Sequence, residues 1–129
     1  MLHFELLKGQ GVLVLTPQEP LEKADFTRVA EEVDLFVAEH GRLRGVLVRA
    51  HSFPGWADFD AFLAHVEFLG RHVREIDRVA IVTDSRILGN IPAIADHFLR
   101  ADVRHFPLDQ AATALAWLEQ DSRGAGESP

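Results

Sequence analysis

The sequence contains no cysteine and only two lysines, Lys8 and Lys23, among its 129 residues. The absence of cysteine excludes disulfide bonds, thiolate zinc sites and a cysteine nucleophile. Residues 1–5 lack the basic and apolar pattern of a secretory signal peptide. No apolar run is long enough to cross a bilayer. The sequence therefore predicts a cytoplasmic protein without a membrane span.

A concentration of positive charge is also absent. The formal net charge is −7, with 13 basic residues scattered among 20 acidic ones. Proteins that bind nucleic acid need clustered lysine and arginine, because affinity follows the number of phosphates that are neutralised. We therefore expect no nucleic acid partner.

What is present is the composition of an ordinary globular protein. Apolar residues make up 47% of the chain and charged residues 26%. A chain of this length fits one domain and can bury about two-thirds of the surface exposed in its unfolded state. We predict one domain over residues 1–120 and a disordered tail, rich in glycine, serine and charge, over residues 121–129.

Five segments have the patterns of β-strands. Apolar and polar residues alternate over 2–6, which predicts a half-buried edge strand, and a glycine-rich turn leads to a second strand over 12–15. Continuous apolar runs within 44–50 and 79–82 are typical of central strands that are covered on both faces. A short fifth strand is predicted over 103–106. The first two strands are expected to form an antiparallel hairpin.

Four segments have apolar residues at helical spacing. The first follows Asp25, which we expect to act as its N-cap, and ends near Gly41. The others run along 59–73, from about Pro92, and from Pro107 onward. Because helices alternate with strands after the hairpin, the fold class is α/β. We predict a mixed, mostly parallel five-stranded sheet with four principal helices.

Four short stretches, set in this order of elements, carry a family resemblance. They are residues 53–56 (Phe-Pro-Gly-Trp), 79–84 (Val-Ala-Ile-Val-Thr-Asp), 103–106 (Val-Arg-His-Phe) and 116–118 (Ala-Trp-Leu). With them, the chain resembles the SpoIIAA-like family of the STAS/Sec14 superfamily over nearly all of residues 2–120. The resemblance implies a STAS-like fold.

The resemblance also implies two kinds of function. STAS domains of the anti-sigma-factor-antagonist kind exchange protein partners when a serine beside an aspartate is phosphorylated, and Sec14-type domains hold a lipid in an apolar pocket. This chain lacks the Asp-Ser-Ser-Gly-type motif after its third strand. Our first hypothesis is a non-enzymatic interaction or regulatory module that binds itself, as a homodimer, or an unknown protein. The second is a carrier or sensor for a small apolar or amphipathic ligand.

The loop after the third strand is the candidate ligand site. It lies at the carboxyl end of a central strand, where open α/β sheets bind ligands. The predicted ligand-binding residues are His51, Ser52, Phe53, Trp56 and Asp84. The alternative is a structural loop, in which residues 54–55 form the turn and the aromatic side chains cover the edge of the sheet.

Two serines are candidate phosphorylation sites, Ser52 in that loop and Ser85 after Asp84. A phosphate on Ser85 would lie near a helix N-terminus, which stabilises negative charge. Asp and Ser are also the usual helix-capping residues, so capping is the competing interpretation.

The seven histidines raise the question of a metal site. His65 and His72 share one side of a predicted helix but lie about 10 Å apart along its axis, too far for one ion. No His-x-x-x-His pair occurs. We therefore predict no metal ligands and no cofactor.

A catalytic triad can be written from Ser52, from His51 or His65, and from Asp84, but the Gly-x-Ser-x-Gly elbow is missing. We predict no catalytic residue, and an enzyme that uses this neighbourhood is the third hypothesis.

A second flank of the helix predicted over 59–73 is partly apolar. It carries Ala61, His65, Phe68 and His72. Such a flank either packs against a neighbouring helix of the same chain or forms a dimer interface. The sequence leaves both open.

Overall fold

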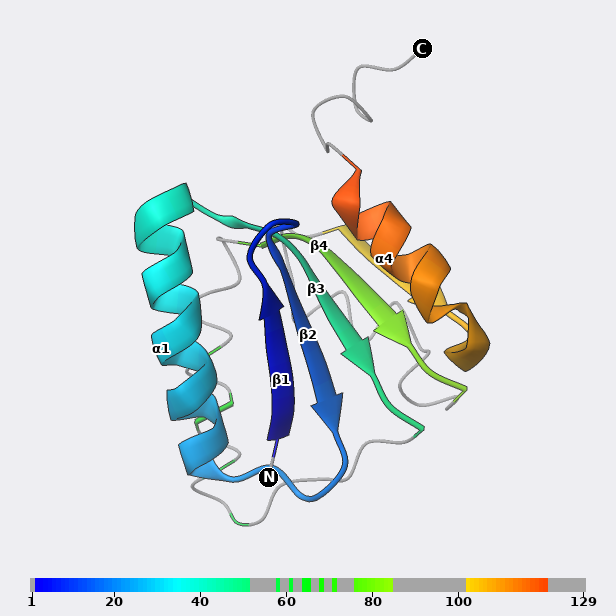
Figure 1. Cartoon of the computed structure of the whole chain (residues 1–129). Coiled ribbons are helices and arrows are strands. Elements are labelled where there is room, and N and C mark those ends of the chain that lie inside the picture. The colour runs from blue at the N-terminus through cyan, green and yellow to red at the C-terminus, as the bar shows by residue number, and fades with distance from the viewer. Residues whose placement is uncertain are drawn as a thin grey trace.

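The structure is a computed structural model that describes residues 2–51, 58, 61, 64–65, 68, 71, 76–84 and 102–120. These residues form a five-stranded sheet with helix α1 on one face and helix α4 on the other (Figure 1). The α/β class and the mixed sheet predicted from the sequence are confirmed.

The strands lie in the sheet in the same order as in the chain. Strands β1 and β2 are antiparallel, and every later neighbour is parallel. The strands are β1 (Leu2–Leu7), β2 (Val12–Pro17), β3 (Leu43–Arg49), β4 (Ile76–Val82) and β5 (Asp102–Phe106). Each begins or ends within about three residues of its predicted bounds, because the apolar pattern marks the buried part of a strand and not its ends.

The hairpin between β1 and β2 depends on a glycine in the left-handed region. Gly11 has a φ of 71°, a value that side-chain-bearing residues rarely adopt. The Leu7 carbonyl accepts hydrogen bonds from the amides of Gln10 and Gly11, at 3.1 and 2.8 Å. The turn therefore closes on the last residue of β1 and returns the chain antiparallel.

Helix α1 (Lys23–His40) corrects one prediction. Glu22, not Asp25, is the N-cap, and Asp25 lies in the first helical turn. The carboxylate of Asp25 turns back and accepts a hydrogen bond from the Glu22 amide at 2.8 Å. At the other end Gly41 has a φ of 90° and donates its N–H to the Val37 carbonyl. The sequence predicted that the helix ends at this glycine.

The structure describes two of the four predicted helices in full. The last predicted helix divides into a 3₁₀ turn, η2 (Leu108–Gln110), and α4 (Ala111–Glu119). Within the described residues, only α1 and α4 form complete α-helices, against the four predicted. Five further residues are helical, namely Ala61, Ala64, His65, Phe68 and Arg71. The helix predicted from Pro92 lies outside the described residues.

Two hydrophobic clusters pack against the two faces of the sheet. The α1-side cluster contains Phe26, Val29 and Val33 of α1. The α4-side cluster contains Trp117 and Leu118 of α4. Because side chains alternate along a strand, neighbouring residues of the central strands belong to different clusters.

Asp25 ties α1 to the start of the sheet. Its side chain is almost fully buried and accepts hydrogen bonds from the Leu2 amide at 3.0 Å and from Nη2 of Arg28 at 2.6 Å. Burial by itself raises the pKa of Asp25. The hydrogen bonds from Leu2, Glu22 and Arg28 outweigh it and hold the pKa below its ordinary value of 3.8. Asp25 is therefore a charged anchor inside the fold.

Candidate functional site

The structure places two of the predicted ligand residues on neighbouring strand ends. His51 follows β3 and Asp84 follows β4, at the carboxyl edge of the sheet. The Ala50 amide donates to the Val82 carbonyl at 3.1 Å, which continues the β3–β4 pairing to this point. Both His51 and Asp84 are exposed. They are thus available to a molecule that approaches this edge.

Hydrogen bonds from Thr83 and His105 fix the same edge. The Thr83 hydroxyl donates to the His51 carbonyl at 3.4 Å. Nε2 of His105 lies 2.7 Å from the Thr83 carbonyl, and it must be the donor because a carbonyl only accepts. The backbone at the ends of β3, β4 and β5 is therefore held in one arrangement.

Asp84 has a capping role, but the amide that it caps comes from a distant part of the chain. Its Oδ1 accepts a hydrogen bond from the Leu108 amide, the first residue of η2, at 3.1 Å. A carboxylate at this position satisfies an N–H group that has no partner within its own helical turn.

Replacing Asp84 by alanine is expected to lower the free energy of unfolding by about 1 kcal/mol, because the Leu108 amide loses its acceptor. Asparagine keeps an acceptor oxygen, so Asp84→Asn should lose less than half as much. Urea unfolding followed by circular dichroism measures both variants. Equal losses in the two would contradict a capping role.

The remaining residues predicted for this site, Ser52, Phe53, Trp56 and Ser85, lie outside the described residues. Their roles in ligand binding or phosphorylation stay predictions.

The flank proposed as an interface faces α1 within the same chain. Ala61 is fully buried, and its amide donates to the Asp58 carboxylate at 2.9 Å. The rings of His65 and Phe68 lie 5.0 and 6.2 Å from the ring of Phe26 in α1. These contacts are compatible with packing against a neighbouring helix of the same chain, and an interface at this flank stays a prediction. His72, the fourth residue of that prediction, lies outside the described residues.

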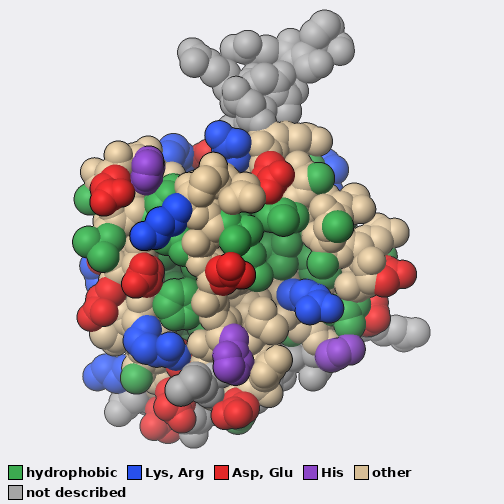
Figure 2. Space-filling model, in the orientation of Figure 1, with side chains coloured by type: hydrophobic (Ala, Val, Ile, Leu, Met, Phe, Trp, Pro, Cys, Tyr) green, Lys and Arg blue, Asp and Glu red, His purple; other side chains and the backbone are tan. Residues whose placement is uncertain are grey.

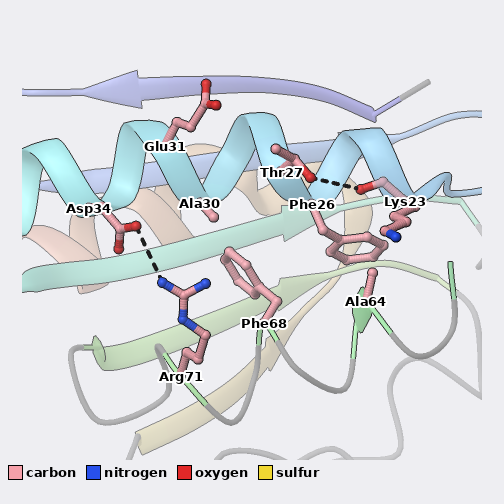
Figure 3. A pocket seen from close by; sticks show the side chains of 9 residues that line it. All are labelled: Lys23, Phe26, Thr27, Ala30, Glu31, Asp34, Ala64, Phe68 and Arg71. Atoms are coloured by element: carbon pink, nitrogen blue, oxygen red, sulfur yellow. Dashed lines mark hydrogen bonds and ion pairs between the residues drawn. The ribbon is translucent and has the colours of Figure 1, made fainter. Parts of the chain in front are cut away.

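An open pocket of about 250 Å³ lies between this flank and α1 (Figure 3). Its lining consists of Lys23, Phe26, Thr27, Ala30, Glu31, Asp34, Ala64, Phe68 and Arg71. Phe26 and Phe68 form its apolar part, and an ion pair between Asp34 and Arg71, 3.6 Å long, stands at one end. Pockets for drug-sized ligands begin at about 300 Å³, so this pocket could hold only a ligand smaller than a typical drug molecule.

Sequence reasoning did not identify a cluster of arginines at the C-terminal end of α4. Arg78 is buried and donates to the Trp117 carbonyl at 2.7 Å, and Arg44 donates to the Glu119 carbonyl at 2.9 Å. The guanidinium groups of Arg78 and Arg104 lie 5.2 and 4.8 Å from the Trp117 ring. Cations near a helix C-terminus interact favourably with the negative end of the helix dipole, so this cluster stabilises the docking of α4.

Two features are absent from the described part of the chain. It contains no group of three His, Asp or Glu side chains arranged to hold a metal ion. None of the helices within it is both long enough and apolar enough to span a membrane.

A mixed sheet with a leading hairpin, covered by α1 on one face and α4 on the other, is consistent with the STAS class of fold. A family model described as SpoIIAA-like matches residues 12–119, and the chain belongs to that family. A solved structure with a TM-score of 0.68 is similar over 92% of both chains, at 19% sequence identity. It is an uncharacterised protein of the DUF3478 family, with a SpoIIAA-like fold, from Shewanella loihica PV-4. The comparison with curated proteins found no match.

Proposed function

We propose that this chain is a non-enzymatic protein-interaction module of the STAS type with a regulatory role. Its family membership supports this class, because the switching STAS domains act by binding other proteins. The observation that carries the proposal is one part of the sheet that no described helix covers.

That part lies on the α4 side, over the first strands. Helix α4 packs chiefly against β3, β4 and β5, and on the same face of the sheet His3 and Glu5 of β1 are exposed. Figure 2 shows hydrophobic side chains gathered on this side beside α4, with charged side chains around them. We name the uncovered residues the open face. They are the exposed His3, Glu5 and Arg49 and the partly buried Leu7, Val14 and Thr16. A mixed apolar and charged surface of this kind suits a protein partner better than a small molecule.

Native mass spectrometry of the full chain purified from its own cells tests the proposal. An interaction module should appear in a complex of defined mass, with one or more further protein chains. Denaturing mass spectrometry of the same sample reports covalent change, and an added phosphate would indicate regulation through a serine such as Ser52 or Ser85. A single bare chain at every concentration would contradict an interaction function.

The second candidate is a carrier or sensor for a small amphipathic ligand. The adjacent exposed positions of His51 and Asp84 at the carboxyl edge favour it, because this edge is where α/β sheets bind ligands. A small mass that is present in the native spectrum and lost on denaturation would favour this function over the first. The ligand should then also raise the melting temperature when it is added back.

A further inference from the structure

Strand β1 is one edge of the sheet, and α1 closes the start of this edge (Figure 1). The Leu2 amide donates to the Asp25 carboxylate at 3.0 Å, and the Leu2 carbonyl accepts from Nη2 of Arg28 at 3.2 Å. The backbone groups of Leu2 therefore turn away from its partner in β2, Pro17, which has no N–H to donate.

The rest of this edge is open. Backbone groups alternate between the two sides of an antiparallel strand, so those of Phe4 and Leu6 point outward, as those of Leu2 do. No residue in the described part of the chain forms a hydrogen bond with the outward N–H and C=O groups of Phe4 and Leu6. Donors and acceptors in such a row are the means by which a sheet takes up a further extended strand.

The edge has one register for pairing with β1 of a second copy. A two-fold axis at Glu5 pairs Phe4 with the second copy's Leu6, and the reverse, which satisfies all the outward groups. An axis at Phe4 would need the backbone groups of Leu2, which α1 already holds. An axis at Leu6 places Phe4 opposite the turn that follows β1. Self-pairing therefore sets Glu5 opposite itself.

The helices leave room for an added strand. Helix α1 packs against β1 and β3, so it lies over the middle of the first three strands. In a pair of copies joined at β1, the two α1 helices would be about three strand spacings, or about 14 Å, apart. Packed helices are separated by roughly 10 Å or less, so the copies would not collide there. Helix α4 lies further from this edge, over β3, β4 and β5.

Charge, by contrast, opposes self-pairing. Residues opposite each other at a position without hydrogen bonds have Cα atoms only about 4.5 Å apart. Glu5 is exposed and forms no ion pair within the described residues. Two carboxylates at this separation repel each other, whereas a cation opposite Glu5 would be attracted. Glu5 also belongs to the open face, because its partner in β2, Val14, is part of the α4-side cluster.

We propose that β1 is a strand-addition site for an extended segment of a partner protein, with a lysine or arginine opposite Glu5, and that Glu5 excludes a second copy of this chain. The proposal rests on the proposed function and names the form of its partner. Main-chain hydrogen bonds to Phe4 and Leu6 hold the added strand, and the charge of Glu5 selects it.

The Glu5→Arg variant is a probe of the required kind, because it carries the same strand with a cation at the deciding position. Isotope-labelled original chain at about 100 μM is mixed with about 200 μM unlabelled Glu5→Arg. NMR should show that exchange with water slows at least about two-fold for the amides of Phe4 and Leu6. The Leu2 amide should not change, because it already donates to Asp25.

Two unlabelled controls should leave these exchange rates unchanged. One is the original chain, and the other is Glu39→Arg, the same charge change at an exposed position of α1. Glu5→Val removes the repulsion, so in sedimentation velocity its dissociation constant should be at least about ten-fold lower than that of the original chain. Circular dichroism should show that all the variants are folded.

Unchanged exchange with Glu5→Arg overturns the proposal, and so does equal slowing by the original chain. A Glu5→Val protein that associates no more tightly than the original shows that Glu5 does not exclude a second copy. If Glu5→Arg has no effect while native mass spectrometry of the cellular protein shows a complex with another chain, the proposed function stands and the β1 edge is not its site.

Discussion

Replacing Gly45 by valine is expected to lower the free energy of unfolding by about 3 kcal/mol, although valine is a better strand former than glycine. Gly45 lies in β3 directly beneath α4. A Cβ atom at this position would stand 2.6 Å from Cδ2, 3.0 Å from Cβ and 3.1 Å from Cγ of Leu118. The first contact can be relieved by rotation of the side chain. The second lies next to the helix backbone, so α4 itself must move away from the sheet.

Alanine provides a graded test of the same contact. Gly45→Ala should cost about half as much as valine, while Gly9→Ala, whose added Cβ meets no atom within 4 Å, should change stability by less than about 0.5 kcal/mol. Urea unfolding at one protein concentration measures all three. A Gly45→Val protein as stable as the original would show that α4 does not depend on this close approach.

A double variant identifies the cause. Leu118→Ala alone removes a buried side chain and should cost about 3 kcal/mol. If the clash is with Leu118, the loss in Gly45→Val/Leu118→Ala should be smaller than the sum of the two single losses by at least about 1 kcal/mol. Additive losses would place the strain elsewhere.

Replacing Asp25 by asparagine is expected to cost about 2 kcal/mol at neutral pH. The carboxylate accepts three hydrogen bonds, from the amides of Leu2 and Glu22 and from the Arg28 guanidinium. Asparagine has one acceptor oxygen, and its NH₂ group would face a donor. Because Leu2 is at the start of β1 and Glu22 at the start of α1, the loss should loosen both together.

The pH dependence of this difference follows from the lowered pKa of Asp25. The folded state holds the carboxylate charged, so its contribution is fully present above the ordinary pKa of 3.8 and is lost as the pH falls through the lower folded value. The stability difference between the original chain and Asp25→Asn should therefore be constant near neutral pH and shrink in acid below pH 3.8. Unfolding in urea at pH 7, 5 and 3 measures it.

The control for Asp25 is Asp77→Asn, which breaks a surface ion pair of 2.6 Å with Arg42. Exposed pairs contribute little, so the loss should be about 0.5 kcal/mol at pH 7. If Asp77→Asn and Asp25→Asn lose the same stability, or if the Asp25 difference grows in acid, the anchoring role of Asp25 is wrong.

The candidate site was only partly predictable. The sequence placed His51 and Asp84 after successive central strands, and parallel pairing then made them neighbours at one edge. It gave no signal for the arginines at the end of α4, because Arg78 follows Asp77 at the polar start of β4 and looks like an ordinary solvated charge. Its partner, the Trp117 carbonyl, is a backbone atom that every residue possesses, and nothing in a side-chain pattern points to it.

Local patterns in the sequence were enough to predict the five strands, helix α1 and the α/β class. Alternation in β1, continuous apolar runs in β3 and β4, and helical spacing in α1 are local patterns, and each reflects how many faces of an element are buried. Tertiary structure decided which distant groups meet. Asp25 became an anchor for Leu2 and not the N-cap of α1, Asp84 caps Leu108, and Gly45 admits Leu118. These contacts join residues far apart in the chain, so their partners depend on the register of the strands and the closeness of the helices, which no local spacing encodes.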